Sequence, residues 1–148
     1  MISTMKNLFI AAIGLSLLLI PVLFSAQTDH PASAGSSVYA ELTKAPKKEA
    51  NRRNPFENDH DAPVAGAKLF AQHCAECHGN TADGGKKGPS LRVNDVQQAA
   101  PGTIYWVLTN GVVRKGMPVW SKLPDAQRWQ LVTYIKSLGS TSKADEHM

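Results

Sequence analysis

Apolar and polar positions divide the chain into four segments of different character. Residues 1–26 contain an almost continuous apolar run, whereas residues 27–62 are polar and show no apolar periodicity. Between residues 63 and 139, apolar positions recur three and four residues apart, as on the buried face of a helix. Residues 140–148 are again polar. The pattern predicts a folded domain over 63–139, preceded by a flexible tether (27–62) and followed by a disordered tail (140–148).

The domain is predicted to be all-α, because its periodic segments have helical spacing and no segment shows the alternation of a strand. Its helices are expected from Pro63 into the cysteine pair, over 94–99, over 103–110 with Thr103 as the cap, and from about Pro124 to Gly139. Gly66 lies inside the first of these helices, where a glycine costs about 1 kcal/mol relative to alanine. A glycine at that place suggests that another helix approaches closely.

The N-terminal apolar run has the pattern of a secretory signal or a membrane anchor. It extends over Leu8–Phe24, with the positively charged Lys6 before it. Its length of 17 residues is at the lower edge for a helix that spans a bilayer. Phe24-Ser25-Ala26 is a poor cleavage site, so a retained anchor is favoured and a cleaved signal is the alternative. Both interpretations predict an exported, periplasmic protein, held at the inner membrane if the anchor is retained.

The folded segment is basic. Residues 63–139 contain nine Lys or Arg and four Asp or Glu, and the whole chain has a formal net charge of +4. Export argues against a nucleic-acid partner, so we expect a protein partner with an acidic docking surface. The cations expected near the candidate site are Lys86, Lys87, Arg114 and Lys115, for which an ordinary solvated surface is the alternative.

Both cysteines of the chain lie in the sequence Cys74-Ala75-Glu76-Cys77-His78. This Cys-x-x-Cys-His pattern is typical of a c-type haem attachment site. Residues three and four apart share one face of a helix, so two thiols and one imidazole can address the same flat ring. The thiols would form thioether bonds to the haem vinyl groups, and His78 would bind the iron. Weaker alternatives are a zinc site, which lacks further ligands, a thioredoxin-like pair, which lacks its βαβ context, and a structural disulfide.

The second axial ligand of such an iron is expected to be Met117. It is the only methionine between residues 63 and 139, and its Gly116-Met117-Pro118 turn is a poor place for a core side chain. Gly116 is expected to allow close backbone approach, and Pro118 to stiffen the loop. His73 is the other histidine of the domain, but it precedes the first cysteine on the same helix and cannot easily reach the opposite face of the ring.

Three further residues are candidates for the wall of this site. The carbonyl of Pro89 is a plausible acceptor for the second ring nitrogen of His78, since metal-binding histidines usually donate that proton to a neighbour. Trp106 and Trp120 are candidate walls of the haem pocket, although large aromatic side chains in a small core are as often ordinary packing.

Together these residues resemble those of a class I cytochrome c, of the small bacterial kind. The resemblance covers residues 63–139, about half of the chain. The motifs that carry it are Gly66 and Phe70, the Cys74–His78 sequence, Gly88-Pro89-x-Leu91, Gly116-Met117-Pro118, and Leu131 with Tyr134. It implies three to five helices wrapped around one covalent haem c, with the first and last helices crossing where Gly66 lies under Tyr134.

The function implied is one-electron transfer between exported or membrane redox partners, by a monomeric carrier that is not itself an enzyme. A second hypothesis is a haem c subunit of a larger periplasmic dehydrogenase or terminal oxidase, which an anchor and a tether would favour. A third is a ligand-binding or peroxidatic haem protein in which Met117 is displaced. That hypothesis is the weakest, because the sequence supplies no obvious acid or base beside the open position.

Overall fold

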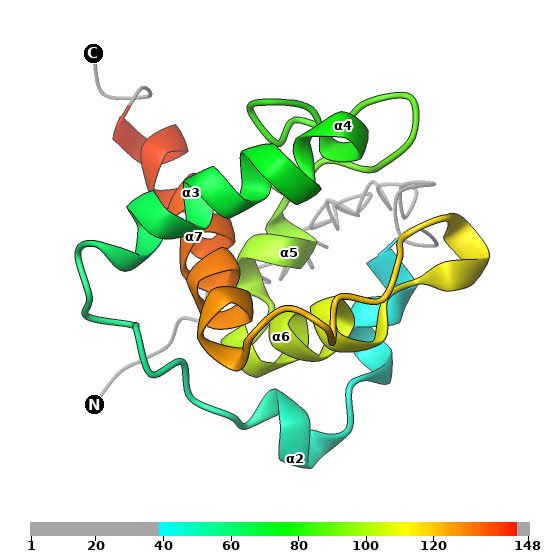
Figure 1. The fold of residues 1–148 in the computed structure, drawn as a ribbon, viewed down its shortest axis with the longest axis horizontal. Coiled ribbons are helices and arrows are strands. Elements are labelled where there is room, and N and C mark those ends of the chain that lie inside the picture. Colours follow the sequence, from blue (N-terminus) through cyan, green and yellow to red (C-terminus); the bar gives the residue numbers. More distant parts are fainter. Residues whose placement is uncertain (1–38, 145–148) are drawn as a thin grey trace, which may run out of the picture. The chain divides into compact units, whose positions relative to one another are not determined.

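The computed structural model describes residues 39–144, with side chains described as far as residue 139 (Figure 1). The predicted signal or anchor, the first part of the predicted tether and the last four residues lie outside this range. In chain order the elements are η1 (Ala40–Lys44), α2 (Lys47–Ala50), α3 (Ala62–His73), α4 (Ala75–His78), α5 (Asn94–Gln98), α6 (Pro101–Asn110), η2 (Val113–Lys115) and α7 (Asp125–Ala144). Within these residues the only β-type pairing is an isolated bridge between Val112 and Met117, so the all-α prediction is confirmed.

The crossing of α3 and α7 forms the centre of the domain (Figure 1). A Cβ on Gly66 would lie 2.1 Å from the Gln130 carbonyl oxygen and 2.7 Å from the Cβ of Tyr134. One turn further along α3, the ring of Phe70 lies 5.2 Å from that of Tyr134. The largest fully buried side chains, Phe70, Leu131 and Val132, come from these two helices. The helical glycine therefore serves close helix approach, as the sequence predicted.

Two helix boundaries differ from those expected. α6 begins at Pro101 rather than Thr103, because proline fits the first helical turn without a capping side chain. Thr103 is buried inside that helix and does not cap it. α7 continues past Gly139 to Ala144, so the predicted tail is helical in its first part. Gly139 keeps a helical backbone and does not adopt the left-handed conformation in which a glycine commonly ends a helix.

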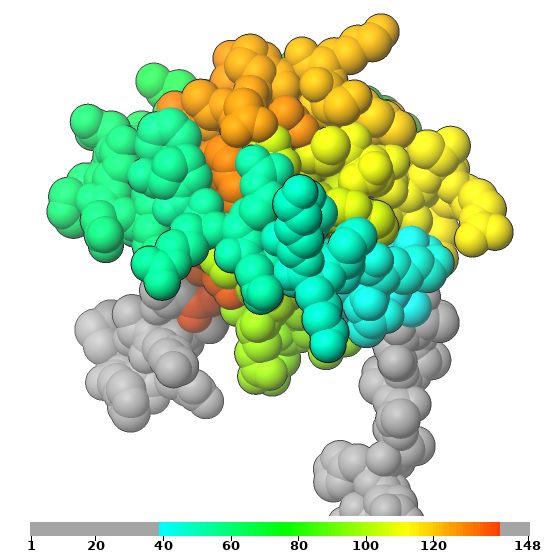
Figure 2. All heavy atoms as spheres, turned by 90° about the horizontal axis from the view of Figure 1, so that it is seen from below, coloured from blue at the N-terminus to red at the C-terminus, as the bar shows by residue number. Residues whose placement is uncertain are grey.

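Residues 39–60, which we call the N-terminal strap, pack against the domain instead of forming a flexible tether. Figure 2 shows the strap in cyan and teal, lying against α6. Arg52 stacks over the ring of Tyr105, with 4.3 Å from its guanidinium carbon to the ring centroid. The buried Asn54 donates a hydrogen bond to the Thr133 hydroxyl at 2.8 Å. A polar composition predicted disorder, but a few specific long-range contacts hold this segment.

Among residues 39–144, no helix is both long enough and apolar enough to cross a membrane.

Candidate cofactor site

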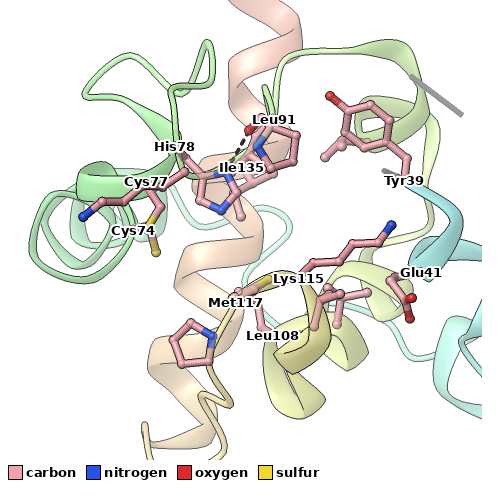
Figure 3. A pocket seen from close by; sticks show the side chains of 18 of the residues that line it. Tyr39, Glu41, Cys74, Cys77, His78, Leu91, Leu108, Lys115, Met117 and Ile135 are labelled. Atoms are coloured by element: carbon pink, nitrogen blue, oxygen red, sulfur yellow. Dashed lines mark hydrogen bonds between the residues drawn. The ribbon is translucent and has the colours of Figure 1, made fainter. Parts of the chain in front are cut away.

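A cavity of about 430 Å³ lies beside the Cys-x-x-Cys-His segment, within the range of about 300–1,000 Å³ typical of ligand pockets (Figure 3). Apolar side chains of α5, α6 and α7 form its inner wall, among them Val96, Ile104, Leu108 and Ile135. The predicted residues that line it are Cys74, Cys77, His78, Pro89, Met117 and Trp120. The fold thus gathers six of the seven predicted site residues around one apolar space.

The two thiols reach the cavity because the chain changes direction at the first of them. Cys74 ends α3, and its carbonyl accepts hydrogen bonds from the Cys77 and His78 amides at 3.1 and 2.9 Å. This tight turn of α4 places both half-buried cysteines at one edge of the cavity (Figure 3). Burial, and secondarily the neighbouring Cys77, raises the pKa of the Cys74 thiol to about 11. That thiol is therefore protonated at neutral pH.

The imidazole of His78 is oriented by the backbone of the following loop. Its Nδ1 lies 2.8 Å from the Pro89 carbonyl oxygen, the contact expected from the sequence. A carbonyl only accepts hydrogen bonds, so Nδ1 carries the proton and Nε2 presents its lone pair. Gly88 permits this arrangement, since a Cβ there would lie 3.0 Å from the Cys77 carbonyl oxygen and 3.1 Å from Nδ1 of His78. The imidazole is thus prepared to bind a metal through Nε2.

Met117 lies on the other side of the cavity from His78 (Figure 3). Its backbone exchanges two hydrogen bonds with Val112, of 3.0 and 3.2 Å, which close a short loop. The expected reason for Gly116 is wrong: a Cβ there would meet no atom within 4 Å, and the residue is required by its φ of +87°. Close approach occurs instead at Gly111, where a Cβ would lie 2.6 Å from the Pro118 carbonyl oxygen.

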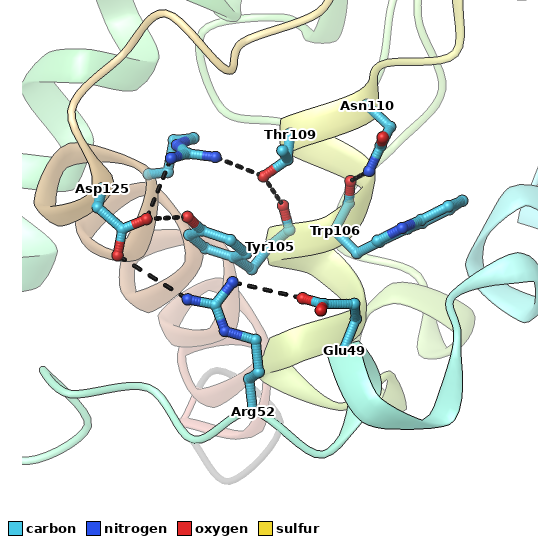
Figure 4. Close-up of polar contacts among 8 residues, drawn as sticks. Glu49, Arg52, Tyr105, Trp106, Thr109, Asn110 and Asp125 are labelled. Carbon is cyan, nitrogen blue, oxygen red and sulfur yellow. Dashed lines mark hydrogen bonds and ion pairs between the residues drawn. The ribbon is translucent and has the colours of Figure 1, made fainter.

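The structure separates the two predicted tryptophans. Trp120 lines the cavity, and its ring lies 5.3 Å from that of His73, which also lines it. Trp106 instead borders a second pocket formed with residues of the strap and α7, including Arg52 and Arg128. Figure 4 shows Trp106 and Tyr105 on α6, with Glu49 and Arg52 of the strap. Helical geometry explains the difference, because a position two residues after Ile104 is rotated by about 200° around α6. Trp106 therefore does not form a wall of the cofactor cavity.

Three of the four cations predicted near the site line the cavity, and Arg114 is not among them. Lys86, Lys87 and Lys115 line it, and all three are exposed. Lys87 forms an ion pair of 2.6 Å with Glu76, which lowers the pKa of that carboxyl. Such exposed pairs contribute little to stability, and this one partly neutralises the charge on the cysteine side.

Sequence reasoning missed the contribution of the strap. Tyr39, Glu41 and Leu42 line the cavity, although the sequence predicts a flexible tether over these residues. Tyr39 and Leu42 also pack against the core, which their isolated positions in a polar segment did not reveal.

Within residues 39–144 there is no cluster of three or more His, Cys, Asp or Glu side chains that could hold a metal ion by themselves.

These groups fit a haem c. An apolar cavity, a thiol pair at one edge, an imidazole nitrogen and a thioether on opposite sides are the features that such a ring requires. Gly88 leaves room where a side chain would contact the imidazole.

Comparison with known proteins identifies the family of the domain. The family model described as cytochrome c oxidase, cbb3-type, subunit III matches residues 61–135, just over half of the chain. The cbb3-type cytochrome c oxidase subunit FixP of Bradyrhizobium sp. is 33% identical over 90 residues, which cover 57% of this chain and 30% of that protein. Cytochrome c550 of Pseudomonas aeruginosa is 32% identical over 92 residues, covering 58% of this chain and 62% of that protein.

A solved structure also resembles this chain. Cytochrome cL from the marine methylotroph Methylophaga aminisulfidivorans superposes with a TM-score of 0.53 at 27% identity, covering 71% of this chain and 77% of that one.

The cbb3-type subunit CcoP of Azospirillum sp. is a further sequence relative, 37% identical over 84 residues, which cover 50% of this chain and 28% of that protein. The chain therefore spans less than two thirds of the length of each of the three curated relatives.

Proposed function

This chain belongs to the cytochrome c family, in the group described as cbb3-type cytochrome c oxidase subunit III, and from this premise we propose that it carries single electrons on one haem c held between His78 and Met117. When bound, the haem supplies an iron that alternates between the ferrous and ferric states. The observation that carries the proposal is the placement of His78 and Met117 on opposite sides of a cavity with Cys74 and Cys77 at one edge.

Each of these residues has a separate task. Cys74 and Cys77 hold the ring covalently as thioethers. His78 binds through Nε2, while its Nδ1 proton, donated to the Pro89 carbonyl, keeps the imidazole oriented and more basic. Met117 would bind the iron from the other side of the cavity, and its thioether would favour the reduced state, which raises the reduction potential. With both residues bound, the protein would leave no iron position open for oxygen chemistry.

The experiment that tests this ligation is the visible spectrum of the reduced, matured protein with and without carbon monoxide. We expect a low-spin spectrum that the gas does not change. Met117→Ala should open the site and bind carbon monoxide rapidly. Val119→Ala alters an exposed side chain in the same loop and is the matched control. Rapid binding by the unaltered protein would contradict ligation by Met117 and favour a ligand-binding function.

A second candidate function is that of an electron-transfer subunit in a larger oxidase. The family description and the names of two relatives favour it, since both relatives are cbb3-type oxidase subunits. This chain matches only about 30% of each of those proteins, so it would supply one haem domain and not the whole subunit. Co-purification of the tagged chain with a larger haem protein from detergent-solubilised membranes would support the subunit, and recovery as a lone monomer would support the carrier.

The partner we propose is a redox protein with an acidic docking surface in the periplasm. The exposed Lys86 and Lys115 at the cavity mouth, with the neighbouring Arg114, support this charge complementarity. The exported location rests on the N-terminal apolar run, and on the periplasmic setting typical of bacterial cytochromes c. The electron-transfer rate with the physiological partner should fall as ionic strength rises, and a rate independent of salt would contradict electrostatic docking.

A further inference from the structure

The strap forms one side of the cofactor cavity although it precedes the range that the family model matches, residues 61–135. Figure 3 shows Tyr39 and Glu41 on the side of the cavity away from Cys74 and Cys77. We propose that the strap belongs to the haem site, where it closes this side of the cavity to water and thereby raises the reduction potential of the haem. The inference rests on the proposed function, because it requires a haem in the cavity.

The strap is fixed to the loop that orients His78. The hydroxyl of Tyr39 donates a hydrogen bond to the Ser90 carbonyl at 2.9 Å. Ser90 directly follows Pro89, whose carbonyl accepts the Nδ1 proton of His78. The phenol has one proton and uses it here, so the ring of Tyr39 is held over the cavity as a wall and not as a donor into it. Leu42 lies in η1, which directly follows Tyr39, and adds an aliphatic side chain to this wall.

A second attachment lies where the strap crosses α6. Gly102 is buried under α2, and a Cβ there would lie 2.1 Å from the Glu49 carbonyl oxygen and 2.8 Å from that of Ala50. The backbones of the two segments thus touch directly, which only glycine permits. Arg52 continues the contact, since its guanidinium lies over the rings of Tyr105 and Trp129. The strap is therefore seated along its length and not only at its first residue.

Solvent access at this wall affects the two oxidation states differently. Water stabilises the more positively charged oxidised iron, and the side chains of Tyr39 and Leu42 withhold that stabilisation. The Glu41 carboxylate on the same side is paired with Lys44 at 2.7 Å, which offsets its charge. A closed strap therefore favours the reduced state and raises the potential. Opening the strap, or making its inner face polar, lowers it.

Two substitutions in the matured full-length protein test this effect. Gly102→Ala forces the strap away from α6 without altering a cavity side chain, and Leu42→Asn makes the inner face of the strap polar without altering the Tyr39 hydrogen bond or the Gly102 contact. Thr43→Val is the control, because the Thr43 hydroxyl bonds only within the strap, to the Ala40 carbonyl, and is exposed. The measurements are the midpoint potential and the hydrogen exchange of the strap amides.

We expect Gly102→Ala and Leu42→Asn each to favour the oxidised form about tenfold at a fixed solution potential, which is about 59 mV for one electron. Gly102→Ala should also speed exchange of the strap amides, and Thr43→Val should leave both measurements unchanged. A potential in Leu42→Asn equal to that of the control would overturn the inference, even if Gly102→Ala failed to fold. Failure of the proposed function is distinct, since the unaltered protein would then lack the low-spin spectrum or would bind carbon monoxide.

Discussion

Replacing Gly66 with alanine tests the packing of α3 on α7, because two effects of opposite sign compete at this position. In an isolated helix the substitution would stabilise the fold by about 1 kcal/mol through helix propensity. In the structure the new methyl group would lie 2.1 Å from the Gln130 carbonyl oxygen and 2.7 Å from the Cβ of Tyr134. Neither contact involves the free end of a flexible side chain, so the helices themselves must separate.

The magnitude follows from these contacts. Overpacking a core ordinarily costs about 1–3 kcal/mol, and a contact with rigid backbone belongs at the upper end of that range. Subtracting the propensity gain leaves a net loss of about 2 kcal/mol in the free energy of unfolding. For a domain of this size, each kcal/mol lowers the melting temperature by roughly 4–8 °C, so a decrease of roughly 8–16 °C is expected.

The assay is thermal and denaturant unfolding of the haem-loaded protein, followed by circular dichroism. Val64→Ala in the same helix is the matched control, because Val64 is 57% exposed and its substitution should change stability by no more than about 0.5 kcal/mol. A Gly66→Ala protein as stable as the unaltered one, or more stable, would refute the close crossing of α3 and α7.

Three further predictions concern other parts of the fold. Asn54→Ala should cost about 1–3 kcal/mol in urea unfolding, since its side chain satisfies buried polar groups, and an unchanged midpoint would mean that the strap is free in solution. Burial and a hydrogen bond to Asp125 raise the pKa of Tyr105. The protonated phenol therefore stabilises the fold fully below the unfolded pKa of about 10, and this contribution is lost as the pH rises through the folded pKa. In an alkaline titration of the free energy of unfolding, Tyr105→Phe should therefore lose less stability than the unaltered protein. Gly116→Ala should cost about 1–2 kcal/mol because of its φ of +87°, and it should make the Met117 position more accessible to carbon monoxide; equal stability would contradict the left-handed backbone.

Much of the site could be predicted because its chemistry is local. The two thiols and His78 come within one turn of helix, so their common direction follows from spacing alone. The Pro89 carbonyl lies eleven residues further on, in a loop that packs so closely on the imidazole that a Cβ on Gly88 would lie 3.1 Å from Nδ1 of His78. The crossing at Gly66 was also predictable, since a glycine inside a helix costs stability unless another segment needs the space.

The two tryptophans show where pattern reasoning was incomplete. Both are large aromatic residues of the same domain, and residue type alone does not distinguish the wall of the cofactor cavity from that of a second pocket. Helical spacing separates them, because Ile104 and Leu108 face the cavity and Trp106 lies on the other side of α6. Trp120 lies in a loop, so its place beside His73 depended on the tertiary fold.

The sequence by itself determined the cofactor chemistry and the all-α class, because each depends mainly on residues within a few turns of one another. It also indicated that a second helix packs closely on Gly66, because a glycine inside a helix costs stability unless another segment needs the space. Only the tertiary structure decided that the strap is part of the domain. Its contacts join residues far apart in the chain, 51 positions from Tyr39 to Ser90 and 79 from Asn54 to Thr133. Composition averages over a segment, whereas a few well-placed contacts to a preformed surface can offset the entropy of ordering it.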